Sequence, residues 1–116
     1  AQIFQDEGLD PTVIVGSLFK DKNNLNTNFI GGKSKYFIVE ACEYRRSFLN
    51  INPDIVVITN IGEDHLDYYK DIEDIKSAFS EIASQTSNFI ICNPNESSVS
   101  SILKKKYKNN FILIFQ

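Results

Sequence analysis

The sequence predicts an α/β fold in which a mostly parallel sheet is flanked by helices. Two observations lead to this class. Short apolar segments alternate along the chain with segments of helical periodicity, which is the order found in parallel sheets with right-handed crossovers. The apolar residues between Asp54 and Asn60 are continuous rather than alternating, as expected of a parallel strand buried on both faces. A chain of 116 residues suits one domain with a single core.

The strands are predicted from short apolar runs bounded by turn residues. They span residues 12–15, 36–41, 54–60, 89–92 and 111–115. Residues 20–28 are polar and rich in asparagine, which predicts a loop. A short strand near residues 29–30 could follow this loop. The tripeptide from Gly32 to Ser34 is not a P-loop, because Thr27 stands where the first glycine is needed and a strand follows instead of a helix. We therefore interpret it as a turn.

Three helices are predicted. The first covers residues 1–7 and ends at Gly8, a residue type that favours the position just after a helix. The second runs from about residue 72 to residue 84, where apolar residues recur at spacings of three and four. Its apolar stripe consists of Ile72, Ile75, Ala78, Phe79, Ile82 and Ala83. Asp71 can cap this helix by accepting a hydrogen bond from its first turn.

The third helix starts at Ser97 or Ser98 and ends in a run of lysines. Its inward-facing residues are Val99, Ile102, Leu103 and Tyr107. The lysines are Lys104, Lys105, Lys106 and Lys108. Cations at this end complement the helix dipole, so a solvated face is favoured over a phosphate-binding patch.

Composition excludes several classes of partner. A net charge of −3 offers no electrostatic footprint for nucleic acid, and no apolar run approaches the length that spans a bilayer. No basic-then-apolar leader is visible, and therefore no secretory signal. Cys42 and Cys92 lie far apart and form neither a redox pair nor a four-ligand zinc pattern. Isolated reduced thiols fit a reducing cytoplasm, where we expect the protein, and a disulfide is the less favoured state.

Charged residues follow two of the predicted strands. Glu40 closes one strand, and His65, the single histidine, lies beyond the next in a segment with Glu63, Asp64 and Asp67. Ligands of open parallel sheets bind outside the carboxyl ends of the strands, so we expect Glu40 and His65 to share a cation site. Imidazole by itself favours zinc, manganese or iron over magnesium. A general-base histidine and a merely solvated acidic loop remain alternatives.

Two arginines follow Glu40 closely. Arg45 and Arg46 could clamp a phosphate or carboxylate group with paired hydrogen bonds. They could equally form ion pairs with Glu43 or another acid. The sequence favours neither anion binding nor ion pairing for these two arginines.

Three segments together resemble the central domain of the Mur ligases. They are Glu40-Ala-Cys-Glu-Tyr-Arg-Arg-Ser-Phe-Leu49, Pro53-Asp-Ile-Val-Val-Ile-Thr-Asn-Ile61 and Asp64-His-Leu-Asp-Tyr-Tyr69. Leu9 to Thr12 also resembles the stretch that leaves the first helix of that family. The similarity covers residues 1 to about 95, and the order and separation of the segments make it specific.

The resemblance implies a function that the residues alone leave open. Mur ligases join an amino acid to a UDP-muramic acid precursor of peptidoglycan, and they consume ATP through an acyl phosphate. It implies that Glu40 binds Mg²⁺ near the ATP phosphates, that Asn60 lies at the nucleotide, and that His65 binds a magnesium ion bridging the γ-phosphate and the substrate carboxylate. It suggests substrate binding by Arg45 and Arg46. The Glu-Ala-Cys-Glu-Tyr variant implies UDP-N-acetylmuramate and L-alanine as substrates.

The resemblance also implies missing parts. The P-loop of the family lies just ahead of Ala1, and its UDP-sugar-binding and amino-acid-binding domains are absent. We therefore expect residues 1–116 to be part of a Rossmann-like, P-loop-type ATPase domain without its P-loop segment, inactive alone and prone to self-association through exposed apolar edges. Two other classes of protein are alternatives to the ligase. One is a metal-dependent hydrolase using Glu40, Asp64 and His65, and the other is a non-catalytic α/β interaction module.

Overall fold

The computed structural model describes residues 1–21, 23–93, 95–103 and 111–114, with only the backbone for 103 and 111–114. The chain divides into two compact units, Ala1–Ala41 and Cys42–Gln116. The predicted lysine run and Tyr107 lie outside the described residues. Within the described part, no helix is long and apolar enough to cross a membrane.

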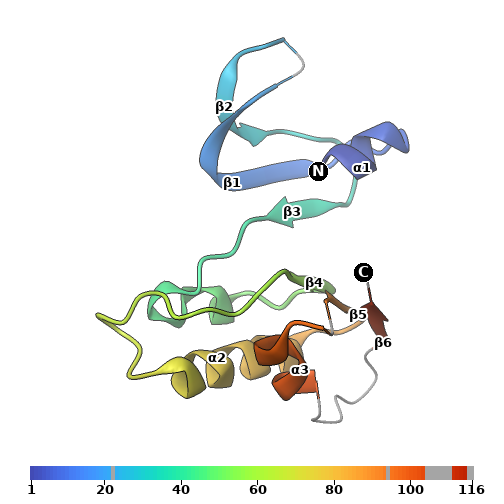
Figure 1. Cartoon of the computed structure of the whole chain (residues 1–116). Helices are drawn as coiled ribbons and strands as arrows, with labels where there is room; N and C mark the ends of the chain where they lie inside the picture. Colours follow the sequence, from blue (N-terminus) through green and yellow to red (C-terminus); the bar gives the residue numbers. More distant parts are fainter. Residues whose placement is uncertain (22, 94, 104–110, 115–116) are drawn as a thin grey trace. The chain divides into compact units, whose positions relative to one another are not determined.

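The first unit holds a small sheet of mixed direction (Figure 1). Its elements are α1 (Gln2–Asp6), β1 (Thr12–Lys20), β2 (Asn26–Ile30) and β3 (Phe37–Val39). The strand order is β2-β1-β3, with β1 antiparallel to β2 and parallel to β3. Strands at the positions of β1 and β3 and the helix before them were predicted, whereas the pairing of these two strands and the antiparallel hairpin were not.

The hairpin between β1 and β2 corrects the predicted loop over residues 20–28. β1 continues to Lys20, and β2 already begins at Asn26. Asp21 closes the turn, because its Oδ1 accepts hydrogen bonds from the backbone N–H groups of Asn23 at 2.9 Å and Leu25 at 2.8 Å. Asn24 takes a positive φ of 61°, which asparagine tolerates better than most residues. The polar composition thus belongs to an exposed hairpin.

The turn before β3 needs a glycine at position 32. A Cβ atom there would lie 2.2 Å from the carbonyl oxygen of Asp10. Asp10 also accepts two backbone hydrogen bonds of 2.9 Å. Its carboxylate accepts from the N–H of Lys33, and its carbonyl accepts from the N–H of Ser34. This close approach explains the Gly-Lys-Ser sequence as turn chemistry, and a strand follows it as predicted.

The second unit is an α/β structure built on a parallel sheet. Its elements are the 3₁₀ helix η1 (Tyr44–Asn50), β4 (Ile55–Ile58), α2 (Ile72–Gln85), β5 (Phe89–Cys92), α3 (Ser97–Leu103) and β6 (Phe111–Ile114). The strand order is β4-β5-β6, and both pairings are parallel. The predicted α/β class and the order of β4, α2, β5, α3 and β6 are confirmed, whereas the 3₁₀ helix η1 was not predicted.

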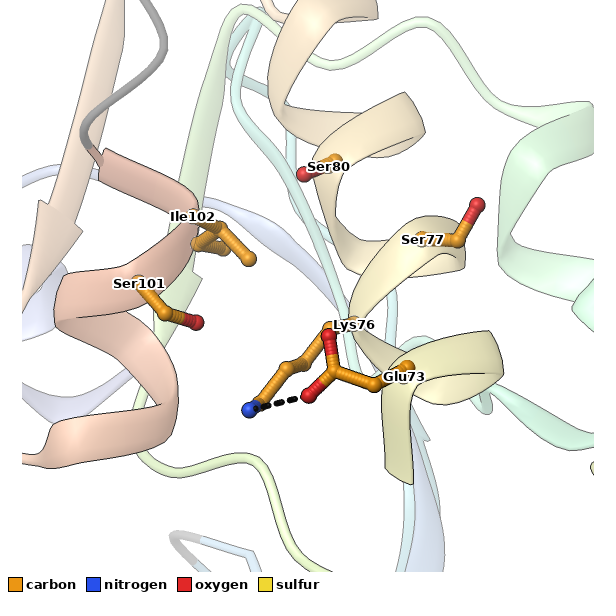
Figure 2. A pocket seen from close by; sticks show the side chains of 6 residues that line it. All are labelled: Glu73, Lys76, Ser77, Ser80, Ser101 and Ile102. Atoms are coloured by element: carbon orange, nitrogen blue, oxygen red, sulfur yellow. Dashed lines mark hydrogen bonds and ion pairs between the residues drawn. The ribbon is translucent and has the colours of Figure 1, made fainter. Parts of the chain in front are cut away.

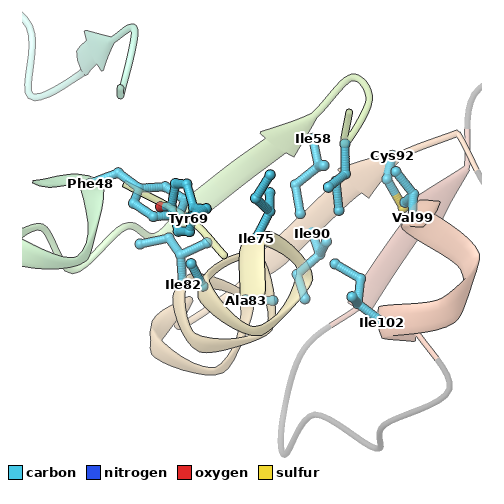
Figure 3. Packing of buried hydrophobic residues seen from close by; sticks show 12 residues of the cluster. Phe48, Ile58, Tyr69, Ile75, Ile82, Ala83, Ile90, Cys92, Val99 and Ile102 are labelled. Carbon is cyan, nitrogen blue, oxygen red and sulfur yellow. The ribbon is translucent and has the colours of Figure 1, made fainter. Parts of the chain in front are cut away.

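Helix α2 supplies much of the core of this unit. Asp71 caps it, since its Oδ1 accepts a hydrogen bond from the backbone N–H of Asp74 at 2.9 Å. The helix packs its predicted stripe against β4 and β5 (Figure 3). The buried cluster contains Phe48, Ile58, Ile61, Tyr69, Ile75, Ala78, Ile82, Ala83, Ile90, Cys92, Val99 and Ile102. Full burial of one such aliphatic side chain stabilises the fold by about 1.5–3 kcal/mol.

Candidate functional site

Glu40 lies directly after β3 in the first unit. Its backbone N–H donates to the carbonyl of Ile14 at 2.9 Å, which extends the parallel pairing of β1 and β3 by one bond. Its Oε2 accepts a 2.7 Å hydrogen bond from the backbone N–H of Gly16. The carboxylate is therefore held at the end of a strand, and the residue is exposed.

His65 lies in the connection between β4 and α2. Its backbone has a φ of 55°, in the left-handed region that a residue with a Cβ rarely occupies. The carbonyl oxygen of His65 accepts hydrogen bonds from the N–H groups of Tyr68 at 2.9 Å and Tyr69 at 3.0 Å. Strained backbone of this kind persists only where surrounding contacts enforce it, and it is common at ligand sites.

The imidazole ring of His65 lies among acids and one aromatic ring. Glu43 Oε1 is 3.8 Å from Nε2, and Asp64 Oδ1 is 3.9 Å from Nδ1. Both separations exceed a hydrogen bond, so these carboxylates supply negative potential rather than a fixed partner. The Tyr44 ring packs against the imidazole with centroids 4.9 Å apart. The His65 side chain remains 32% exposed, which leaves it accessible to a ligand.

Two tyrosines hold the segments that surround His65. The hydroxyl of Tyr69, a residue only 1% exposed, donates to the carbonyl of Glu43 at 2.5 Å. Burial raises the pKa of Tyr69, so its phenol stays a protonated donor. The hydroxyl of Tyr44 donates to Asp67 Oδ2 at 3.0 Å.

For Arg46, the structure shows the ion-pair alternative. Its Nη2 lies 2.6 Å from Asp74 Oδ1, and its Nη1 lies 3.4 Å from Glu81 Oε2. A backbone hydrogen bond from Lys70 and the guanidinium of Arg46 hold the pKa of the Asp74 carboxyl below its usual range. Arg45, by contrast, is exposed, and its guanidinium lies 5.4 Å from the centre of the Tyr44 ring. Both arginines have positive φ angles, 51° and 55°.

Asn60 lies just beyond the carboxyl end of β4 and is exposed. Its Oδ1 accepts a long hydrogen bond of 3.4 Å from the hydroxyl of Thr59. A side chain at this edge can reach a ligand of the sheet.

The predicted pairing of Glu40 with His65 stays a prediction. Glu40 belongs to the first unit and His65 to the second. The structure does bring together a different set, since ligand atoms of Cys42, Glu43 and His65 all lie within 4.8 Å of one another. Sequence reasoning treated Cys42 as an isolated thiol and missed this cluster. The sequence offered one indication of this cluster: Cys42 and Glu43 closely follow the predicted site residue Glu40.

A separate hollow lies between α2 and α3 (Figure 2). It has a volume of about 190 Å³ and is lined by Glu73, Lys76, Ser77, Ser80, Ser101 and Ile102. Its two charged side chains already pair with each other, with Lys76 Nζ 2.8 Å from Glu73 Oε1. The hollow includes none of the predicted site residues.

Comparison with known proteins identifies the family. A model of the Mur ligase middle domain matches residues 2–115. The chain belongs to the Mur ligase middle-domain family. This membership confirms the resemblance carried by the segments at residues 40–49, 53–61 and 64–69, and it does not support the hydrolase or the interaction module.

Curated relatives extend this match. The UDP-N-acetylmuramate--L-alanine ligase of Caldicellulosiruptor saccharolyticus is 50% identical over 96 residues, which cover 81% of this chain and 20% of the relative. The ligase of the same name from Clostridium tetani is 44% identical over 106 residues, covering 90% of this chain and 23% of the relative. The chain thus spans about a fifth of the length of the curated relatives that it matches.

Solved structures of Mur ligases share the fold. UDP-N-acetylmuramate:L-alanyl-gamma-D-glutamyl-meso-diaminopimelate ligase from Neisseria meningitides matches with a TM-score of 0.74 at 22% identity, over 95% of this chain and 39% of that one. UDP-N-acetylmuramate-alanine ligase from Thermotoga maritima gives a TM-score of 0.72 at 21% identity, over 96% of this chain and 24% of that one.

Proposed function

We propose that the chain is part of the central, ATP-binding domain of an ADP-forming ligase that joins L-alanine to UDP-N-acetylmuramate in peptidoglycan synthesis. One observation carries the proposal. Eight curated relatives at 43–50% identity bear the name UDP-N-acetylmuramate--L-alanine ligase. The reaction activates a carboxylate by phosphoryl transfer from ATP and then joins it to an amine.

The donors present fit a role for Mg²⁺ beside ATP. Glu40 offers an exposed carboxylate whose orientation is fixed by the Gly16 N–H, and carboxylate oxygen is a preferred ligand of Mg²⁺. His65 offers an accessible imidazole in a region of negative potential. We assign Mg²⁺ binding to Glu40 and to His65, each taken by itself, and nucleotide oxygens would complete the coordination. The ion would neutralise charge between the approaching phosphate and carboxylate groups.

Asn60 and the arginines take supporting roles in this proposal. Asn60, exposed just beyond the end of β4, would contact the nucleotide. Arg45 is the better candidate for an anionic substrate group, because it is exposed and has no acidic partner among the described residues. Arg46 would have to leave its 2.6 Å contact with Asp74 in order to bind a substrate. Its observed position instead fixes η1 against α2.

The cytoplasm is the compartment that this function requires, because ATP and UDP-linked precursors are available there. The structure supports this with free thiols at Cys42 and Cys92.

The test measures ADP formation by the protein expressed from the complete reading frame that encodes this chain. We expect turnover to need ATP, Mg²⁺, UDP-N-acetylmuramate and L-alanine together. His65→Asn and Glu40→Gln should each lower kcat by about 100-fold or more, because each removes stabilisation of charge at the reacting phosphate. Glu63→Gln, which removes an exposed carboxylate two positions away from His65, is the matched control. ADP formation that does not need the amino acid, or that survives both substitutions, would refute the proposal.

A further inference from the structure

Cys42, Glu43 and His65 form a cluster that the proposed ligase chemistry does not use as a unit. One thiol sulfur, one carboxylate oxygen and one imidazole nitrogen all lie within 4.8 Å of one another. We propose that these three side chains bind one Zn²⁺ ion, with water or another ligand in the fourth position.

The distances suit zinc. Zinc bonds of about 2.0–2.1 Å to nitrogen and oxygen and about 2.3 Å to sulfur place tetrahedral ligand atoms about 3.3–3.6 Å apart. Glu43 Oε1 and His65 Nε2 are already 3.8 Å apart. Cys42 is exposed, so rotation of its side chain can bring the sulfur into range without disturbing the core.

The backbone of each donor is already held in place. The carbonyl of Cys42 accepts hydrogen bonds from the hydroxyl of Ser47 at 2.8 Å and the N–H of Phe48 at 3.1 Å. The carbonyl of Glu43 accepts from the buried hydroxyl of Tyr69. The two N–H groups that bond the carbonyl of His65 fix that residue in its left-handed conformation. Holding the ligand-bearing backbone in this way reduces the entropy lost when an ion binds.

The donor chemistry separates this ion from Mg²⁺. A thiolate and an imidazole select zinc, whereas Mg²⁺ prefers oxygen ligands and retains its waters. A site with three protein ligands and one open position resembles accessible zinc sites rather than closed structural ones. This proposal uses Cys42 and Glu43, which have no role in the proposed ligase, together with His65, which the proposed function assigns to Mg²⁺. One neutral imidazole cannot hold both ions, so Zn²⁺ and Mg²⁺ exclude each other at His65. The test is made without ATP and Mg²⁺ and does not depend on catalysis.

The experiment replaces zinc with Co²⁺ as a visible probe and titrates the purified protein. We expect one equivalent to bind, to produce a thiolate-to-cobalt charge-transfer band, and to be displaced by Zn²⁺. Cys42→Ser should abolish the band and weaken Zn²⁺ binding by about 10-fold or more, and His65→Asn and Glu43→Gln should weaken it similarly. Cys92→Ser is the matched control, because Cys92 is a free but fully buried cysteine in β5. Glu63→Gln is the control for the carboxylate.

X-ray absorption at the zinc edge of the unsubstituted protein removes any dependence on how the variants fold. We expect one sulfur neighbour at about 2.3 Å among nitrogen and oxygen neighbours. A shell without sulfur would overturn the proposal. So would a charge-transfer band that persists in Cys42→Ser, a band lost only in Cys92→Ser, or Zn²⁺ affinity unchanged in both His65→Asn and Glu43→Gln.

Discussion

The phenol hydroxyl of Tyr69 donates a 2.5 Å hydrogen bond to the backbone carbonyl of Glu43. This contact ties the segment before α2, which carries His65, to the segment before η1, which carries Cys42 and Glu43. The ring of Tyr69 also lies below the guanidinium of Arg46, 5.8 Å from the ring centre. One buried side chain therefore positions the groups that surround the candidate site.

Removing the hydroxyl tests this role. Tyr69→Phe removes one of two hydrogen bonds that the carbonyl of Glu43 accepts, the other coming from the backbone N–H of Arg46 at 2.9 Å, so we expect a loss of about 0.5–1.5 kcal/mol in the free energy of unfolding. Zn²⁺ binding should weaken as well. Urea denaturation and Co²⁺ titration measure the two effects. Tyr68→Phe is the matched control because Tyr68 is 43% exposed, and an equal loss in both variants would contradict the role of Tyr69.

The core prediction concerns Ile82 on the buried face of α2. Ile82→Ala leaves a cavity against the sheet, so we expect a loss of about 2–5 kcal/mol in the free energy of unfolding, again measured in urea. Leu66→Ala removes an aliphatic side chain that is 57% exposed and should change stability by less than about 0.5 kcal/mol. Comparable effects at the two positions would contradict the described core.

The pH prediction concerns Asp74. Its pKa in the folded protein lies below the value of 3.8 for an unperturbed carboxyl, chiefly because of the backbone hydrogen bond from Lys70 and also because of Arg46. The stabilisation is therefore complete above the unfolded pKa and is lost as the pH falls through the folded pKa. Asp74→Asn should lower stability at pH 7 and flatten the fall of stability below pH 4 or so. Denaturation of both proteins between neutral and acidic pH measures this, with Glu63→Gln as control. If the free energy of unfolding of Asp74→Asn fell with pH as steeply as that of the unsubstituted protein, the role of Asp74 would be contradicted.

Nucleotide binding by residues 1–116 alone should be weak. The Gly-Lys-Ser sequence from Gly32 to Ser34 forms a turn before β3, not the strand–loop–helix arrangement that cradles phosphates. We expect isothermal titration of these residues with Mg-ATP to show no low-micromolar binding. A dissociation constant in that range would show that residues 1–116 contain a phosphate site of their own.

The sequence predicts local structure well where short-range patterns decide it. Helix α2 and its cap at Asp71 follow from residues within one or two turns of one another, and both appear as expected. The hairpin that joins β1 to β2 was missed, because the residues around its turn, from Lys20 to Asn28, are polar and lack the apolar run that signals a buried strand. The turn that makes it possible depends on hydrogen bonds to one carboxylate, that of Asp21.

Contacts between distant residues explain the other misses. The choice between ion pair and substrate clamp for Arg46 depends on Asp74, which lies 28 positions away along the chain. The Cys42–Glu43–His65 cluster likewise exists only because two separate connections of the second unit meet. Residue types alone suggested metal binding at His65, but only the fold shows which thiol accompanies it.

The measurement closest to the central claim follows the imidazole of His65 by NMR. His65 is the single histidine of residues 1–116, and its ring signals in the protein from the complete reading frame are identified by their absence in His65→Asn. Mn²⁺, added with ATP to the protein from the complete reading frame, stands in for Mg²⁺ and broadens the signals of nuclei near the ion. We predict strong broadening of the His65 ring signals at stoichiometric Mn²⁺ with ATP, and much less when Mn²⁺ is added without ATP. Ring signals that stay sharp, or that broaden equally without ATP, would contradict Mg²⁺ binding by His65 beside the nucleotide.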